Sequence, residues 1–315
     1  MSTIAATDST RRTVELALRR RGLDVRGRAF HALLLFTLLI SLGFLVVLLW
    51  TTWNTARPVF TERGWEFVRS DVSSLATRAG VWQGIVGSLI LAGFVIVVAL
   101  PLGVGAAIYL EEYARETALN RVLIANIRNL AGVPSVVYGI LGLVVFAQAL
   151  RRVTGPEVAG LSYISGGLTL AVLVIPIVIL VTMEALRAVP TSIREAAYGV
   201  GATRWEVVRS HVLPYAAPGV LTGSILSLAR AFGETAPLLL VGAVTGYIST
   251  GGDRGLIGTL QGRFTALPTL IFSFSRQIGD GWRANAAAAI IVLLVVILAV
   301  NAVAIVLRNR YERKW

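Results

Sequence analysis

The sequence predicts an all-α polytopic membrane protein with six transmembrane helices. Hydrophobic residues make up 56% of the 315-residue chain and charged residues only 15%, whereas an ordinary soluble domain carries about 25% charged residues. The mean hydropathy, +0.75, is correspondingly high. Six apolar runs are long enough to cross a bilayer. Together these features exclude a soluble globular enzyme and a disordered protein.

Each apolar run accounts for one predicted span. A helix needs roughly 17–25 residues to cross about 30 Å of hydrocarbon, and the second and fifth runs are longer than that. The spans divide the chain into a cytoplasmic N-terminal segment (1–29), a transmembrane domain (30–307, with a core of about 84–307) and a cytoplasmic tail (308–315). The predicted spans are, in order, residues 31–50, 84–109, 130–150, 166–183, 218–244 and 286–307.

Features of the individual runs support this assignment. Trp50 ends the first run and Trp82 precedes the second, as expected of an aromatic belt at a membrane interface. Pro134 and Pro176 lie in the third and fourth runs and are candidate hinges. The sixth run opens with four alanines, residues 286–289, which suit close contact between helices.

The distribution of arginine predicts the orientation of the spans. The termini and the segments 111–128 and 184–215 together carry 18 basic residues, and the intervening loops carry 10. The positive-inside rule therefore places both termini in the cytoplasm, in a multi-pass protein of the plasma membrane. Basic residues at these positions fit topology and contact with lipid headgroups, so we expect no nucleic-acid partner.

Residue usage also excludes several kinds of chemistry. The chain has no cysteine, and its one lysine is Lys314, so thiolate metal sites and a Walker A loop are both excluded. His31 and His211 are the only histidines. We therefore expect no metal or cofactor in this chain. An intramembrane enzyme is disfavoured, because no pairing of a nucleophile with a base is recognisable.

The cytoplasmic segment 190–214 is predicted to form two short helices. Each is expected to start with a capping box, in which Ser or Thr is followed three residues later by Glu. Gly201 lies between the helices and can adopt the positive φ that a helix C-terminus often requires. Such a compact unit is suited to docking a soluble partner. The two predicted boxes are Ser192 with Glu195 and Thr203 with Glu206.

The fifth run contains a charged pair, Arg230 and Glu234, whose spacing of four residues predicts a shared helix face. Arg230 lies about 18 Å along a helix that starts at Pro218, near the middle of the bilayer, where a charge costs at least about 2.5–3.5 kcal/mol. Pro237 is expected to free the carbonyl of Gly233. The pair predicts an anion pathway, and a structural ion pair that fixes helix packing is the alternative.

The segment 190–214 resembles the EAA loop of ABC importer permeases. The matching positions carry Glu-Ala-Ala, a glycine and a terminal Leu-Pro, and the departure is His211, where the family usually has an aliphatic residue. The resemblance implies the MetI-like type I permease fold and a loop that inserts into a groove of the ATPase subunit. The implied coupling residues are Arg194, Glu195, Ala196, Ala197, Gly201, Leu213 and Pro214.

The run Gly-Glu-Thr-Ala-Pro at 233–237, with Arg230 before it, is similar to the PstA and PstC permeases of phosphate ABC importers. The runs at 107–115, 132–142 and 264–269 resemble the PstA side. This resemblance implies that Arg230 and Glu234 take part in phosphate passage. The implied partners are a PstC-like second permease, two copies of a PstB-like ATPase that bind ATP and Mg²⁺, an extracytoplasmic phosphate-binding protein and membrane lipid.

Two alternatives to a phosphate permease stay open. One is a permease for another oxyanion, such as molybdate or sulfate. The other is an ion-coupled secondary transporter, which would be expected to show repeated halves and several intramembrane carboxylates. No internal repeat is visible. The predicted spans contain one carboxylate, Glu234, and it lies four residues after Arg230. The sequence therefore favours an ATP-driven permease.

Overall fold

The computed structural model describes residues 25–243 and 255–311, and all regular structure within these ranges is helical. The chain divides into two units, residues 1–51 and 52–315. In its described part the first unit is the N-terminal portion of α2 (Val25–Glu62), which contains the predicted first span. Residues 26–50 of this helix are exposed along their whole length, as a lipid-facing helix would be.

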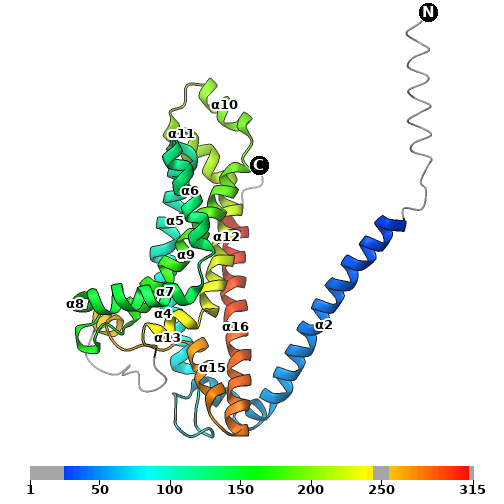
Figure 1. Cartoon of the computed structure of the whole chain (residues 1–315), viewed down its shortest axis with the longest axis vertical. Coiled ribbons are helices and arrows are strands. Elements are labelled where there is room, and N and C mark those ends of the chain that lie inside the picture. The colour runs from blue at the N-terminus through cyan, green and yellow to red at the C-terminus, as the bar shows by residue number, and fades with distance from the viewer. Residues whose placement is uncertain (1–24, 244–254, 312–315) are drawn as a thin grey trace, which may run out of the picture. The chain divides into compact units, whose positions relative to one another are not determined.

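Four further long helical rods match predicted spans (Figure 1). Within the described residues, five helices including α2 are long and apolar enough to cross a membrane, and one bent pair makes a sixth if it is counted as a single span. The second span is formed by α4 (Trp82–Phe94), η1 (Val95–Ala99), α5 (Leu100–Ile108) and η2 (Tyr109–Tyr113). The fourth span is α9 (Tyr163–Arg187), and the sixth is α16 (Asp280–Tyr311). The fifth span is formed by α11 (Arg204–Val207), η5 (Val208–Val212) and α12 (Leu213–Gly233).

The predicted third span is not a single straight helix. Residues 130–150 include only the last two residues of α6 (Ala118–Ala131), followed by a break and by α7 (Ser135–Gly142), which continues as η3 (Leu143–Ala149). The two helical halves meet at an angle of 98°, and α6 extends back into the segment 111–128, which had been predicted to lie outside the spans. The break falls at residues 132–134. Pro134 has φ −56° and ψ 136°, so it acts as the N-cap of α7 instead of continuing α6. A proline has no N–H to donate to the preceding turn, which explains the break at this position.

The fifth span also differs from its prediction. The helix starts at Arg204 instead of Pro218, and it ends at Gly233 because Glu234 adopts an extended conformation with ψ 118°. A separate short helix, α13 (Ala236–Leu240), follows. Pro237 lies in the first turn of α13, where a proline costs no hydrogen bond. It therefore does not free the carbonyl of Gly233 by interrupting a continuous helix, as had been expected, and residue 244 lies outside the described residues.

Short helices occupy the remaining described segments. The bounds of these elements are α3 (Trp65–Arg69), α8 (Arg151–Thr154), η4 (Pro156–Val158), α10 (Thr191–Gly199), α14 (Gly255–Leu260) and α15 (Leu267–Arg276).

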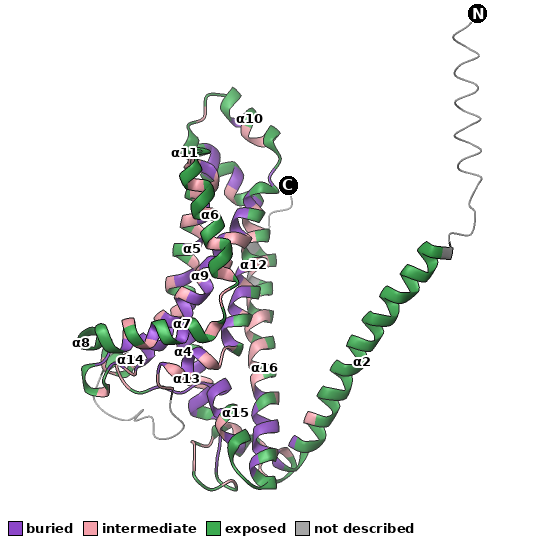
Figure 2. Cartoon of the chain, in the orientation of Figure 1, coloured by how far each residue is buried: buried purple, intermediate pink, exposed green. Residues whose placement is uncertain are grey.

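The helix α9 is the centre of the second unit, as its buried residues in Figure 2 show. It packs against α4, α5, α6, α7 and α12. Close approach depends on glycine: a Cβ at Gly103 would come within 2.6 Å of Val178, and a Cβ at Gly223 within 2.6 Å of Val181. Gly219 and Gly223 form a small-xxx-small pair on α12, a pattern that lets two helix backbones approach closely.

Candidate functional site

The ion pair of Arg230 and Glu234 lies at the break between α12 and α13. The Nε of Arg230 is 3.6 Å from Oε1 of Glu234, a distance beyond that of a hydrogen bond. The two residues do not share a continuous helix face, as had been predicted, because Glu234 is the extended residue that ends α12. The pair nevertheless forms, since the side chain of Glu234 reaches back over the last turn.

The two side chains differ in exposure. The Arg230 side chain is 56% exposed and the Glu234 side chain 15% exposed. Within the described part of the chain, Glu234 is the one ion-pair partner of Arg230, and no hydrogen bond holds its guanidinium. Arg230 also lies in the last turn of α12, where the helix dipole favours a positive charge. Its planar donor fork is therefore available to an anion.

Figure 1 shows α13, which follows this break, at the height of the middle of α16. Ala231 and Phe232, which follow Arg230, belong to a buried cluster against which Val296 and Ile297 of α16 pack. These two residues lie at the midpoint of the 32-residue helix α16. If α16 crosses the bilayer, this position corresponds to the region near the membrane midplane.

The second broken span meets the first at this level. A Cβ on Gly139 of α7 would come within 2.7 Å of the Cα of Pro237 in α13, so the two backbones are in direct contact. Tyr138 donates a hydrogen bond from its hydroxyl to the carbonyl of Leu130, which ties α7 to the end of α6 across the bend. Discontinuous helices that meet near the midplane are a recurrent feature of transporter substrate sites.

Residues 190–214, which we call the coupling knob, project at one end of the unit (Figure 1). A small apolar core holds the knob on the ends of the spans. Ile193 and Ala197 of α10 point into this core, and Val207 and Val212 join it from the start of the fifth span. The knob is therefore a packed structure with a fixed outer face.

A Schellman motif ends the first helix of the knob. Gly201 has φ +87°, its N–H donates to the carbonyl of Tyr198, and the N–H of Ala202 donates to the carbonyl of Ala197. These two bonds satisfy carbonyls at the end of α10. The positive φ expected at Gly201 is confirmed.

One of the two predicted capping boxes is present. The N–H of Thr203 donates to Oε2 of Glu206 at 2.7 Å, and the N–H of Glu206 donates to Oγ1 of Thr203 at 3.4 Å. The predicted box of Ser192 and Glu195 is wrong. Helix α10 begins at Thr191 with Pro190 as its N-cap, so Ser192 is already inside the helix.

The structure divides the predicted coupling residues into an outer and an inner group. Glu195, Ala196, Gly201 and Pro214 are exposed, so they are available to a partner. Ala197 is buried and Leu213 packs against the core of the knob. Arg194 also points inward, and its Nη2 lies 2.6 Å from Oε1 of Glu112 at the end of the second span. Ala197, Leu213 and Arg194 are thus turned towards the interior of the knob and away from its exposed surface.

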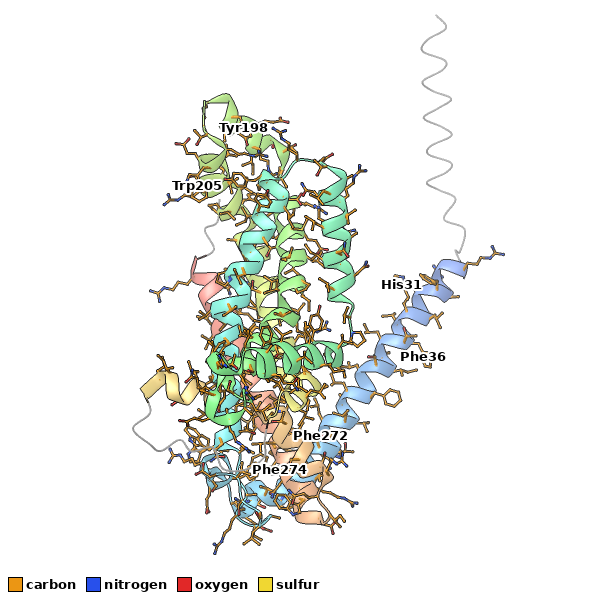
Figure 3. All side chains as sticks on the ribbon, turned by 60° about the vertical axis from the view of Figure 1, so that its left-hand side comes forward. His31, Phe36, Tyr198, Trp205, Phe272 and Phe274 are labelled. Carbon is orange, nitrogen blue, oxygen red and sulfur yellow. The ribbon has the colours of Figure 1, made fainter. Side chains whose placement is uncertain are left out.

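Three apolar residues outside the predicted set are also exposed on the knob. Tyr198 and Trp205 lie on the outside of the knob (Figure 3), and both are about half exposed, while Val200 is 84% exposed. Exposed aromatic and aliphatic side chains that cluster on one surface mark an interaction site. Tyr198 and Trp205 are the two aromatic residues of the segment 190–214, and they were a signal in the sequence that could have identified this surface.

These features define a multi-pass membrane protein with a broken span at a charged pair and a compact helical loop at one end. Residues 99–315 match the family of binding-protein-dependent transport system inner membrane components. The chain belongs to this family.

Relatives of known function cover most of the chain. It is 30% identical over 295 residues to the phosphate transport system permease protein PstA 1 of Mycobacterium tuberculosis, covering 93% of this chain and 91% of the relative. It is also 30% identical over 260 residues to the phosphate transport system permease protein PstC of Mesorhizobium japonicum, covering 76% and 77%.

Solved structures share the fold. A bacterial alginate ABC transporter, in complex with a periplasmic protein bound to an alginate pentasaccharide, aligns with a TM-score of 0.63 at 17% identity, covering 92% of this chain and 96% of that one. The MetNI methionine ABC transporter aligns with a TM-score of 0.51 at 18% identity, covering 74% and 95%. The predicted type I, MetI-like permease fold is confirmed.

Proposed function

We propose that this chain is the PstA-type permease subunit of an ATP-driven importer that carries inorganic phosphate across the plasma membrane. The observation that carries the proposal is the guanidinium of Arg230, half exposed at the meeting point of two broken spans and held by one long contact to Glu234. The guanidinium is planar, always positively charged and carries several N–H donors, so it can bind two oxygens of a tetrahedral oxyanion at once. The names of the relatives supply the identity of that oxyanion.

Glu234 gives the site a weak hold on its substrate. A carboxylate 3.6 Å from the Arg230 guanidinium competes with an arriving anion for the same charge. Transport requires binding that is favourable enough for entry and weak enough for release. The pair therefore passes phosphate along and does not store it.

The proposed partner subunits follow from the missing nucleotide-binding motif and from the exposed surfaces of the coupling knob and of Arg230. Its sequence has no Walker A loop, so we assign ATP and Mg²⁺ to two copies of a PstB-like ATPase, one of which docks on the exposed face of the coupling knob. A PstC-like permease completes the pathway at the exposed side of Arg230. An extracytoplasmic binding protein delivers phosphate. We assign both termini to the cytoplasm, an orientation that the arginine distribution supports.

The decisive experiment is uptake of labelled phosphate into vesicles that carry the full complex, with and without ATP. Unlabelled phosphate, sulfate and molybdate are added as competitors. We expect ATP-dependent uptake that phosphate alone suppresses. Suppression by sulfate or molybdate at lower concentration would reassign the substrate to another oxyanion, and uptake that persists without the ATPase would identify a secondary transporter.

A further inference from the structure

Three consecutive residues at the end of the second span hold three arginines from the region of the coupling knob. Glu111, Glu112 and Tyr113 form the last part of η2, a π-helical turn that ends this span; we call them the Glu-Glu-Tyr turn. Their partners are spread over 18 residues of chain, from the end of α9 to the start of α11. The pairs are Glu111 with Arg187, Glu112 with Arg194, and Tyr113 with Arg204.

The central pair is the most extensively bonded. Arg194 donates from Nη2 to Oε1 of Glu112 at 2.6 Å and from Nε to Oε2 at 3.5 Å. The same guanidinium donates to the carbonyl of Leu186 at 2.9 Å and to that of Val189 at 2.8 Å. One side chain of α10 thus joins the end of the second span to the end of α9.

Burial distinguishes this pair from its neighbour. The Glu112 side chain is 9% exposed and that of Arg194 21%, whereas the side chains of Glu111 and Arg187 are 20% and 45% exposed. Removing one partner of a buried ion pair leaves an uncompensated charge and is strongly destabilising. A pair that is more open to solvent contributes little. Glu112 is therefore the residue on which the contact depends.

Connectivity makes this contact mechanically significant. The knob is joined by the chain itself to α9 on one side and to the fifth span on the other, but it has no covalent link to the second span. The Glu-Glu-Tyr turn connects the two non-covalently through its ion pairs and ring contact. Ile108 of α5 adds an apolar contact to the core of the knob. Short π-helical segments occur frequently at functional sites.

We infer that the Glu-Glu-Tyr turn is a positioning element that transmits displacement of the coupling knob to the second span, with the Glu112–Arg194 pair as its main connection. This inference rests on the proposed function, because it assumes that an ATPase moves the knob. It assigns Arg194 to transmission inside the permease and not to contact with the ATPase. Without the pair, the knob would move while the second span stays behind.

The test measures phosphate taken up per ATP hydrolysed by the full complex. The variant Glu112→Gln keeps the shape of the side chain and removes its charge. The control, Glu116→Gln, changes an exposed glutamate just beyond the turn. We expect Glu112→Gln to retain the ATPase on purification while its uptake per ATP falls at least tenfold, and Glu116→Gln to match wild type. A ratio unchanged in an intact Glu112→Gln complex overturns the inference.

A covalent link provides a second test that holds even if Glu112→Gln fails to assemble. The chain contains no cysteine, so the double variant Glu112→Cys/Arg194→Cys carries two thiols that are unique in this subunit. Joining them with a short bifunctional thiol reagent should restore uptake per ATP to at least half of the wild-type value. Failure of the cross-linked protein to recover overturns the inference.

The wild-type complex, measured in parallel, separates two kinds of failure. A wild type that takes up no phosphate contradicts the proposed function. A working wild type beside an unimpaired Glu112→Gln variant contradicts the transmission role alone.

Discussion

Arg230 and Glu234 form an ion pair across the end of a helix, with 3.6 Å between Nε and Oε1. The carboxylate belongs to an extended residue that ends α12, while the guanidinium remains half exposed. A pair within one continuous helix would be locked in place by the helix. Here the carboxylate is carried by an extended residue outside the helix and makes only a long contact, which suits a site that must bind an anion and then release it.

Replacing Arg230 with alanine should abolish most phosphate uptake. A hydrogen bond to a charged group contributes about 1.5–3 kcal/mol, which corresponds to a loss of roughly 10–100-fold. Uptake by the full complex in vesicles is the measurement, and co-purification of the ATPase shows that the complex is intact. The matched control is Arg283→Ala, which breaks a fully exposed pair of similar length, 3.7 Å to Asp280. Equal uptake in both variants would remove Arg230 from the pathway.

Replacing Glu234 with glutamine should strengthen anion binding and slow release. The change removes the negative charge that competes for Arg230 and leaves a side chain of nearly the same size. We therefore expect a lower half-saturation concentration for phosphate together with a lower maximal uptake rate, each by several-fold. A higher half-saturation concentration would show that Glu234 helps to hold the substrate and does not help to release it.

Replacing Gly201 with alanine should loosen the coupling knob. The residue has φ +87°, and a side chain in this left-handed region costs about 1–2 kcal/mol. We expect weaker retention of the ATPase on purification. The control is Gly199→Ala, two residues earlier, where the glycine is helical and an added Cβ meets nothing within 4 Å. The interpretation fails if Gly199→Ala weakens retention as much as Gly201→Ala does.

Replacing Gly139 with alanine should separate the two broken spans. The new Cβ would lie 2.7 Å from the Cα of Pro237, and overpacking of this kind costs about 1–3 kcal/mol. We expect a lower Tm of the purified complex and reduced uptake. Gly105→Ala is the control, since a Cβ there meets nothing within 4 Å. If both variants keep the wild-type Tm and uptake rate, the contact of α7 with α13 is not needed for transport.

Features set by neighbouring residues could be predicted from the sequence. The positive φ of Gly201 and the capping box of Thr203 with Glu206 depend on a few consecutive residues, and both are present. The box of Ser192 with Glu195 was wrong, although it has the same pattern. Pro190 is compatible with the N-cap position and starts α10 two residues too early for Ser192 to act as the cap.

Features set by distant contacts could not be predicted. Pro134 indicated a hinge, but the 98° bend depends on how α7 packs against α13, about 100 residues away in sequence. The inward direction of Arg194 depends on Glu112, 82 residues earlier. In the sequence, Glu112 is indistinguishable from any glutamate at a solvated helix end. Single-sequence patterns carry no information on such pairs.

Accessibility of position 230 to water is the most direct test of the central claim that Arg230 lines an anion pathway. Because the chain has no cysteine, Arg230→Cys introduces a unique thiol into this subunit, and the other subunits are used in cysteine-free form. We predict that a charged, membrane-impermeant thiol reagent modifies this thiol in the assembled complex, and that the modification rate changes when ATP is added. A thiol that stays unmodified in every state of the ATP cycle would place Arg230 in a dry contact between helices and contradict the account.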